Sequence, residues 1–379
     1  MKQSMLFLLL FFILNLQNNL YSQALPDKQF YKHMEGNINF NINITADLSS
    51  INSKIQGFYY YYFNENKDNN YFIYYGQTIP LQGIINESGD IELTEFNGKG
   101  SIFKGNFTSK KKIEGIWKKS ESDKNLSFEL IEKYPDGTMQ FEVYYLRSEC
   151  RLVEEENSPV ASLELALFDP KNYPDKNISD SVKNIITRNF FGKNFLQTIP
   201  DSMLTKKEEQ YFELYKKSNQ DIYDGGNSFN WEKIKQMNIR YNQDFILSLE
   251  YQDYGYTGGT HGIEVNKFNV IDLKNGNIIT INDIFEDGYK PKLTKILNHK
   301  LRELYLIKPE DNLKDAGFFV DEVKPNNNFY INKDGIGFYY NSYEIAPYSN
   351  GHTDIFISFE DVEDILKNVG VVKRITIVN

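Results

Sequence analysis

The chain has 379 residues, a formal net charge of −10 and an aromatic content of 15%. An acidic chain is on average a poor ligand for a phosphate backbone, which argues against a nucleic-acid partner. Its one cysteine, Cys150, cannot form an internal disulfide, so the fold must depend on its hydrophobic core.

The first residues resemble a secretory signal peptide. Lys2 supplies a positive charge, and residues 5–14 form an unbroken apolar run. This run is shorter than the ~20 residues that a membrane-spanning helix needs, and small residues suited to cleavage follow at Ser22 and Ala24. We therefore predict a signal peptide over residues 1–24 and an exported protein, periplasmic or extracellular, with no membrane span. A buried N-terminal helix is the alternative, although the polar residues over 15–23 interrupt it.

Residues 28–150 are predicted to form an all-β domain, either an antiparallel barrel or a sandwich. About eight or nine short strands, spaced roughly ten residues apart and separated by turn signals, are typical of both architectures. Alternating and short apolar runs predict strands over 38–44, 57–63, 71–75, 79–85, 91–96, 101–107, 113–117 and 126–131, with 141–146 closing the series.

Residues 151–379 are predicted to form an α+β domain, with one antiparallel sheet and helices on one side. Apolar residues at helical spacing predict helices over 180–190, 204–217, 290–306 and 362–366. Strand-like runs cover 238–251, 263–273, 278–281, 329–331, 335–340 and 354–359. We interpret the frequent asparagine and lysine residues of the whole chain as a compositional bias rather than as a functional signal.

A glycine-rich loop, residues 254–262, stands between two of these strands. It reads Tyr254-Gly-Tyr-Thr-Gly-Gly-Thr-His-Gly262. Glycine loses the most conformational freedom on folding, so it favours positions that need a positive φ or the close approach of another group. No Gly-Lys-Ser/Thr motif follows, and the next element is a strand, so the loop is not a phosphate cradle.

Three motifs occur in a fixed order in the second half: Tyr256-Thr-Gly-Gly-Thr-His-Gly262, Asp272-Leu-Lys-Asn-Gly276 and Tyr343-Glu-Ile-Ala-Pro-Tyr-Ser-Asn-Gly351. With these motifs the second half resembles the exported domain shared by the anti-sigma factor RsiV and the peptidoglycan deacetylase PdaC. The resemblance implies an envelope protein built for recognition, because this domain is a lysozyme receptor in RsiV and stands beside a separate catalytic domain in PdaC. It does not extend to residues 28–150, and the chain lacks the polysaccharide-deacetylase metal motif.

Candidate binding residues lie in the glycine loop and in the distal motif. Pro347 removes one donor from a strand ladder, so its segment belongs at a sheet edge or a bend. If that bend lies beside the loop, the two form one recognition surface; if it does not, the bend is a structural corner. The candidate residues are Tyr256, Gly258, Gly259, His261, Tyr343, Pro347 and Tyr348.

His261 is also the candidate for catalysis or metal binding, because imidazole is a common general base and metal ligand. His261, His352 and Asp354, or Glu264 in place of Asp354, could hold zinc if the two segments meet. The structural alternative is an imidazole that hydrogen-bonds the backbone of its own loop. No His-Glu-x-x-His or Gly-x-Ser-x-Gly motif is present, so we predict neither a cofactor nor a catalytic residue.

These observations predict an exported, non-catalytic envelope protein that recognises peptidoglycan or a muramidase (a lysozyme-type protein). Two alternatives stay open. One is a metal-dependent hydrolase that uses His261, and the other is a lysozyme inhibitor.

Overall fold

The computed structural model describes residues 25–376, apart from 68–69, 97–99, 120–123, 194, 196–198 and 224–228. The predicted signal peptide, residues 1–24, lies outside the described residues. The chain divides between Lys133 and Tyr134 into two compact units. Within the described residues, no helix has both the length and the apolar character needed to span a membrane.

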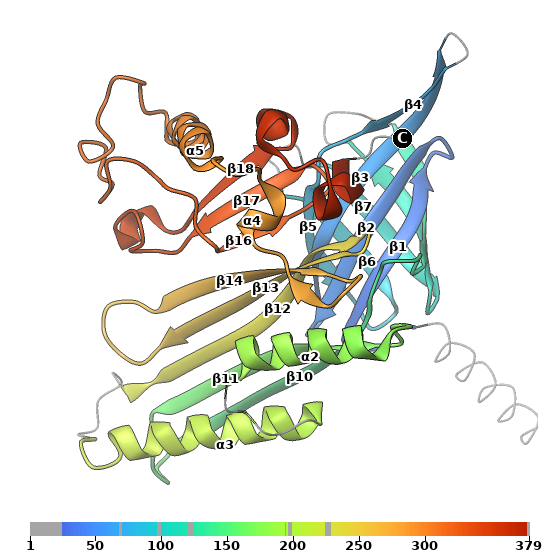
Figure 1. The fold of residues 1–379 in the computed structure, drawn as a ribbon. Coiled ribbons are helices and arrows are strands. Elements are labelled where there is room, and N and C mark those ends of the chain that lie inside the picture. The colour runs from blue at the N-terminus through green and yellow to red at the C-terminus, as the bar shows by residue number, and fades with distance from the viewer. Residues whose placement is uncertain are drawn as a thin grey trace, which may run out of the picture. The chain divides into compact units, whose positions relative to one another are not determined.

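The first unit is built from antiparallel strands only (Figure 1). The strands are β1 (Phe30–Ile38), β2 (Ile42–Ile51), β3 (Lys54–Lys67), β4 (Asn70–Tyr75), β5 (Ile79–Ile85), β6 (Asp90–Glu95), β7 (Ile102–Ser109), β8 (Lys112–Lys118) and β9 (Asn125–Glu132). Strand β2 pairs with both β1 and β3, and β1 pairs with β9, so the sheet closes into a barrel. Strand β4 pairs only with the distal part of β3. The predicted all-β architecture is confirmed, and of the two forms considered it is the barrel.

The barrel core consists of apolar side chains from alternate positions of its strands. Met34, Leu48 and Ile113 are fully buried there. The Phe103 ring makes edge-to-face contacts with Tyr59 and Phe128, at centroid distances of 5.3 and 5.1 Å. Such aromatic pairs add to the stabilisation that comes from burial alone.

The strand predicted over residues 38–44 is wrong. This stretch is the turn between β1 and β2, where Asn39 and Phe40 adopt φ values of 52° and 63°. Ile38 and Ile42 are register partners on the two strands. The alternation of apolar residues therefore continues through the turn and imitates a strand, although the Phe40 side chain is 87% exposed.

The strand predicted over 141–146 exists as β10 (Gln140–Arg151), but it does not close the first domain. It pairs along its whole length with β11 (Val160–Lys171), in the sheet of the second unit. The first compact unit therefore ends at Lys133, earlier than the expected boundary near residue 150.

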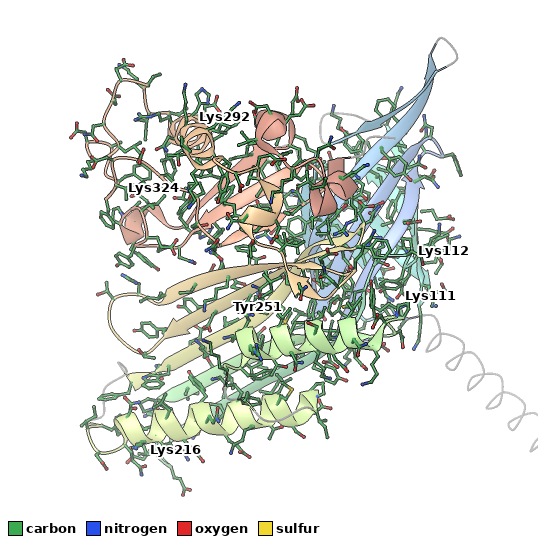
Figure 2. All side chains as sticks on the ribbon, viewed as in Figure 1. Lys111, Lys112, Lys216, Tyr251, Lys292 and Lys324 are labelled. Carbon is green, nitrogen blue, oxygen red and sulfur yellow. The ribbon has the colours of Figure 1, made fainter. Side chains whose placement is uncertain are left out.

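The second unit contains a six-stranded sheet in the order β10-β11-β12-β13-β14-β15. Its remaining strands are β12 (Trp231–Gln243), β13 (Ile246–Tyr256), β14 (Ile263–Asp272) and β15 (Asn277–Ile278). The β11–β12 pair is parallel, because helices α2 (Lys176–Phe190) and α3 (Pro200–Asn219) form the crossover between the two strands. Figure 1 shows both helices lying along β10 and β11. Tyr251 of β13 is buried on the face of the sheet that these helices cover (Figure 2).

Helix α2 begins earlier than predicted because Asp175 caps it. The Asp175 carboxylate accepts hydrogen bonds from the backbone N–H groups of Asn177 at 2.8 Å and Ile178 at 3.4 Å. Its buried side chains recur every four residues, so that one stripe of the helix packs on the sheet. They are Ile178, Val182, Ile186 and Phe190.

The long strand predicted over 238–251 is also wrong, because this stretch spans two strands. Strands β12 and β13 are joined by a turn at Asp244 and Phe245, whose φ values are 57° and 59°. Neither residue is a glycine, so the turn lacks the Asn-Gly or Asp-Gly signal that is typical of such hairpins. Strand β14, predicted over 263–273, is confirmed with bounds Ile263–Asp272.

The rest of the second unit is built around a three-stranded antiparallel sheet of β16 (Phe329–Ile331), β17 (Gly335–Tyr340) and β18 (Thr353–Ser358). The first two strands have the predicted bounds. The accompanying helices are α4 (Ile281–Ile284), α5 (Lys290–Tyr305), α6 (Gly370–Thr376) and the 3-10 turns η2 (Tyr348–Asn350) and η3 (Glu360–Ile365). The predicted α+β class is confirmed, and its strands form two sheets instead of one.

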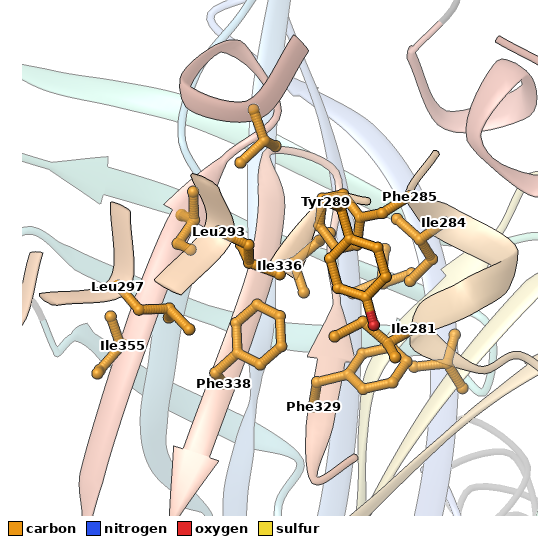
Figure 3. Packing of buried hydrophobic residues seen from close by; sticks show 14 of the residues in the cluster. Ile281, Ile284, Phe285, Tyr289, Leu293, Leu297, Phe329, Ile336, Phe338 and Ile355 are labelled. Carbon is orange, nitrogen blue, oxygen red and sulfur yellow. The ribbon is translucent and has the colours of Figure 1, made fainter. Parts of the chain in front are cut away.

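Helix α5 covers the three-stranded sheet with one apolar stripe. Leu293 and Leu297 of the helix face Ile336, Phe338 and Ile355 of the strands (Figure 3). Each of these side chains is 2% exposed or less. This is the largest apolar core described in the second unit, and it holds the segment after β17 in place.

Two asparagine side chains join the two sheets of the second unit. Asn341 accepts a hydrogen bond from the Asn266 N–H at 2.7 Å and donates one to the Asn266 carbonyl at 3.1 Å. Asn328 accepts from the Phe268 N–H at 3.0 Å and donates to the Asn266 carbonyl at 3.0 Å. These amides occupy the outer edge of β14 as a neighbouring strand would.

Candidate binding site at the glycine loop

The glycine loop connects β13 to β14 and has a conformation that requires its glycines. Gly258 and Gly259 have φ values of 97° and 95°, which disfavour any residue with a Cβ. The Tyr256 hydroxyl donates a hydrogen bond to the Gly259 carbonyl at 3.0 Å. A Cβ at Gly262 would lie 2.4 Å from the Tyr254 hydroxyl oxygen, so this glycine allows the Tyr254 ring to lie against the loop.

The distal motif lies between β17 and β18 and is anchored to the core beneath it. Ile345 and Ala346 are buried in the cluster that also contains α5. The Tyr343 N–H donates to the Ala346 carbonyl at 3.1 Å, which closes a tight turn. Pro347 then precedes the 3-10 turn η2, so it marks a bend outside the strand ladder. The anchored residues hold Tyr343 and Tyr348 at the surface.

The structure brings the loop and the distal motif together. The His261 ring stacks on the Tyr348 ring with a centroid distance of 3.7 Å and an interplanar angle of 10°. The Tyr343 ring lies 5.9 Å from Tyr348. Tyr343 and Tyr348 are 52% and 36% exposed. We call the three side chains of His261, Tyr343 and Tyr348 the aromatic surface.

His261 also hydrogen-bonds its own loop. Its Nδ1 lies 3.0 Å from the Gly262 carbonyl oxygen. Because a carbonyl only accepts, Nδ1 carries the proton in this contact, and Nε2 is the acceptor of the neutral ring. The imidazole is therefore held both by stacking and by a backbone hydrogen bond.

The candidate metal ligands have separate partners. The His352 ring stacks on Tyr339 at 5.0 Å, and the Asp354 carboxylate accepts from the Tyr330 hydroxyl at 2.9 Å. Glu264 accepts from the Asn266 side chain at 3.0 Å. In the part of the chain that the structure describes, no three His, Cys, Asp or Glu side chains are grouped as a metal site would require.

A buried ion pair that the sequence did not reveal lies between the two sheets. Arg240 donates two hydrogen bonds to the Glu250 carboxylate, at 2.8 and 2.9 Å. Its guanidinium also lies 5.1 Å from the Tyr330 ring centre and 5.5 Å from that of Phe268. Burial alone would lower the pKa of Arg240, but Glu250 raises it overall. The arginine thus stays charged beneath Asp354 and Tyr330.

Burial raises the pKa of Asp354 above its ordinary value. Arg240, the Tyr330 hydroxyl and His352 counteract this effect, and Glu250 adds to it. The carboxylate is therefore part of a buried polar network with structural partners on β12, β13 and β16.

Comparison with known proteins supports part of the predicted resemblance. Residues 282–360 match the model of a family described as "Protein of unknown function (DUF3298)". The chain is 28% identical over 174 residues to the peptidoglycan-N-acetylmuramic acid deacetylase PdaC of Bacillus subtilis, a match covering 44% of this chain and 36% of the relative. The chain thus spans little more than a third of that protein's length. The predicted similarity to PdaC is confirmed, whereas the similarity to RsiV stays a prediction.

One solved structure is similar in fold, and a second one matches with a lower score. A DUF3298 family member from Bacteroides fragilis has a TM-score of 0.59 and 26% identity, covering 63% of this chain and 97% of that chain. A DUF3298 family protein from Pseudomonas aeruginosa has a TM-score of 0.43 and 19% identity, covering 60% of this chain and 94% of that chain.

Proposed function

We propose that this chain is an exported cell-envelope protein that binds peptidoglycan through the aromatic surface, without catalysing a reaction. The observation that carries the proposal is the stack of His261 on Tyr348 with the exposed Tyr343 ring beside it. It joins two motifs that lie more than eighty positions apart in the sequence into a single exposed feature.

Exposed tyrosine and histidine rings suit a partner that has both apolar faces and hydroxyl groups. A tyrosine offers an apolar ring and a polar tip, so it can pack on the face of a sugar and hydrogen-bond its substituents. The rings here are fixed by a glycine loop on one side and by Ile345 and Ala346 in the core on the other. Such preorganisation lowers the entropy that is lost on binding.

The name of the relative supports a cell-wall ligand. PdaC is a deacetylase of N-acetylmuramic acid in peptidoglycan, and it shares 28% identity with this chain over 174 residues. We propose that the shared part recognises the same polymer, and we do not extend the deacetylase activity to this chain. The proposed export rests on the predicted signal peptide.

Retention on insoluble peptidoglycan tests the proposal. We expect His261→Ala and Tyr348→Ala each to weaken retention by about tenfold, because stacked aromatic residues dominate such contacts. His299→Ala is the matched control, since His299 lies on α5 with its side chain 70% exposed and far along the chain from either motif. Circular dichroism should show that all three variants are folded.

A second set of measurements separates the alternatives. The first is retention of the chain on immobilised lysozyme instead of on peptidoglycan. If His261→Ala and Tyr348→Ala abolished that retention, the aromatic surface would be assigned to a muramidase-type protein. If the chain also protected cells in a lysis assay, it would be a lysozyme inhibitor. Stoichiometric zinc that is lost in His261→Ala would favour the hydrolase. Equal retention of His261→Ala, Tyr348→Ala and His299→Ala on both matrices would refute the proposed role of the aromatic surface.

A further inference from the structure

A cavity of about 380 Å³ lies on the helix-covered face of the six-stranded sheet, next to the glycine loop. Its wall includes Asn189 of α2, and its floor is formed by β12, β13 and β14. Successive side chains of a strand point to opposite faces, so Asp253 and Gly255 face this cavity while Tyr254 and Tyr256 do not. The cavity and the aromatic surface are therefore separate features of one hairpin.

The strand register explains the shape of the cavity. Lys235 pairs with Asp253, which pairs with Val265 on the next strand. In the neighbouring row, Gly255 stands between Lys233 and Ile263. A Cβ at Gly255 would meet nothing closer than the Lys233 Nζ at 3.6 Å, so the missing side chain leaves open space above the sheet.

The cavity has an excess of positive charge, although the whole chain is acidic. Asp253 accepts hydrogen bonds from both Lys233 and Lys235, the latter at 2.8 Å. Burial alone would raise the pKa of Asp253, but these two lysines lower it overall. Lys267, the register partner of Tyr251, is a third cation in the lining.

Lys207 of α3 is not part of the cavity lining, but it interacts electrostatically with charged residues of that lining. Burial lowers its pKa, and Lys235 and Lys233 lower it further, while Asp253 raises it. Among the described residues, no carboxylate lies within 4.0 Å of the ammonium group of Lys207 or Lys267. The cavity lining thus contains three lysines and one carboxylate, which pairs with Lys233 and Lys235.

A buried hydroxyl lies in the same lining. Tyr251 is 2% exposed, and its hydroxyl has no hydrogen-bond partner among the described residues. Burial raises the pKa of Tyr251, so the hydroxyl stays protonated and available as a donor. Buried polar groups are nearly always paired, and an unpaired one is costly. A ligand oxygen in the cavity would supply the missing acceptor.

We propose that this cavity binds a small organic oxyanion. Lys267 binds the anionic group, the Tyr251 hydroxyl donates a hydrogen bond to it, and the apolar part of the ligand lies on Ile263 and Val265. These two side chains line the cavity and are 51% and 36% exposed. The proposal is independent of peptidoglycan binding, because it uses none of the residues of the aromatic surface.

Calorimetric titration of the full chain at low salt tests the proposal, with citrate and alanylglutamate as carboxylate probes and inorganic phosphate as the phosphate probe. We expect at least one probe to bind with millimolar affinity or better. Lys267→Gln should weaken that binding by about tenfold, because charge-assisted hydrogen bonds are the strong ones. Lys216→Gln, on the exposed face of α3 (Figure 2), removes the same charge and should leave the affinity within about twofold.

Two further variants separate a binding site from a merely charged surface. Tyr251→Phe should weaken binding about fivefold while leaving the thermal stability equal or higher, because it removes an unpaired buried hydroxyl. Gly255→Val should fill the cavity and abolish binding, and valine suits a strand position. Binding of no probe, or equal losses in Lys267→Gln and Lys216→Gln, would overturn the proposal. Unchanged binding in both Tyr251→Phe and Gly255→Val would also overturn it.

Discussion

At the scale of single residues, asparagine has a role that composition alone did not suggest. Besides Asn328 and Asn341, the Asn242 side chain accepts from the Met139 N–H at 2.8 Å and donates to its carbonyl at 2.7 Å. Asn298 makes the same pair of contacts with Val323, at 2.9 and 2.8 Å. These four asparagines have a structural role, because a side-chain amide offers the same donor and acceptor as a peptide unit.

Asn242→Asp should be strongly destabilising. The side chain is fully buried, and the substitution replaces the donor to the Met139 carbonyl with a carboxylate oxygen. We expect a loss of about 3 kcal/mol in the free energy of unfolding, measured with denaturant at neutral pH. Asn277→Asp, at an exposed position, should change it by less than about 0.5 kcal/mol. Equal effects of the two substitutions would contradict a specific role of the Asn242 amide.

The pH dependence of stability should reveal the buried carboxyl of Asp354. Its raised pKa means that the folded chain holds this proton more tightly than the unfolded chain does. The resulting stabilisation is present below the unfolded pKa of about 3.9 and is lost as the pH rises through the folded pKa. Asp354→Asn cannot ionise, so its stability relative to wild type should increase from about pH 4 to neutral pH.

Asp361 provides a control of opposite sign for this experiment. Burial alone would raise the pKa of Asp361, but hydrogen bonds from Ser358 and Lys300 lower it overall. The stabilisation that the Asp361 carboxylate gives to the folded chain is therefore present above the unfolded pKa and is lost as the pH falls. The stability of Asp361→Asn relative to wild type should decrease as the pH rises. If the relative stabilities of Asp354→Asn and Asp361→Asn changed with pH in the same direction, the environments of the two carboxyls would be misassigned.

At the scale of the elements, each helix is stabilised by the side chains of one face. Leu297 and Leu304 both belong to α5, but Leu297 is fully buried and Leu304 is 56% exposed. We expect Leu297→Ala to lower the free energy of unfolding by about 3 kcal/mol, because it leaves a cavity in the core. Leu304→Ala should lower it by less than about 0.5 kcal/mol in the same denaturant titration. A similar loss in both variants would mean that α5 does not pack through this stripe.

The elements that the sequence predicts well are those whose apolar pattern ends at an ordinary turn. Strand β5 has the predicted bounds, Ile79–Ile85, and so do β16 and β17. The predictions fail at 38–44 and at 238–251, where Phe40 and Phe245 adopt positive φ. Aromatic residues are rare in that conformation, so an apolar residue there is read as a strand position.

The sequence predicts the two segments that form the candidate site, but it does not predict that they lie in contact. The loop and the bend at Pro347 both carry local signals, and the structure shows where they lie. Their contact through His261 and Tyr348 depends on how β14 packs beside β16 and β17, which no spacing in the sequence encodes. The same holds for the cavity, whose lysines come from the two strands β12 and β14.

At the scale of the whole molecule, each unit contains one of the two tryptophans. Trp117 lies in the barrel, where its indole donates to Glu95 at 3.4 Å and its ring lies 6.4 Å from Phe103. Trp231 packs against Tyr215 at 5.4 Å in the second unit. Fluorescence of each tryptophan therefore reports on a separate hydrophobic core.

Destabilising one core should move only the transition of its own tryptophan. In single-tryptophan backgrounds, made with Trp117→Phe or Trp231→Phe, we expect Phe103→Ala to lower the denaturation midpoint reported by Trp117, by an amount that corresponds to about 3 kcal/mol. The midpoint reported by Trp231 should stay within experimental error. Leu297→Ala should have the reverse effect, because we expect its core and the separate cluster around Trp231 to unfold together within the second unit. If both midpoints moved together in either variant, the two cores would unfold as one cooperative unit.

The hydrogen bonds of Asn341 and Asn328 to the edge of β14 have a consequence for the rate of amide hydrogen exchange. The amide protons of Asn266 and Phe268 are bound by side-chain oxygens rather than by a neighbouring strand. Deuterium from the solvent can replace them only when Asn341 and Asn328 withdraw. Both amides should then become labelled at a similar rate, which would report how often the two sheets of the second unit separate.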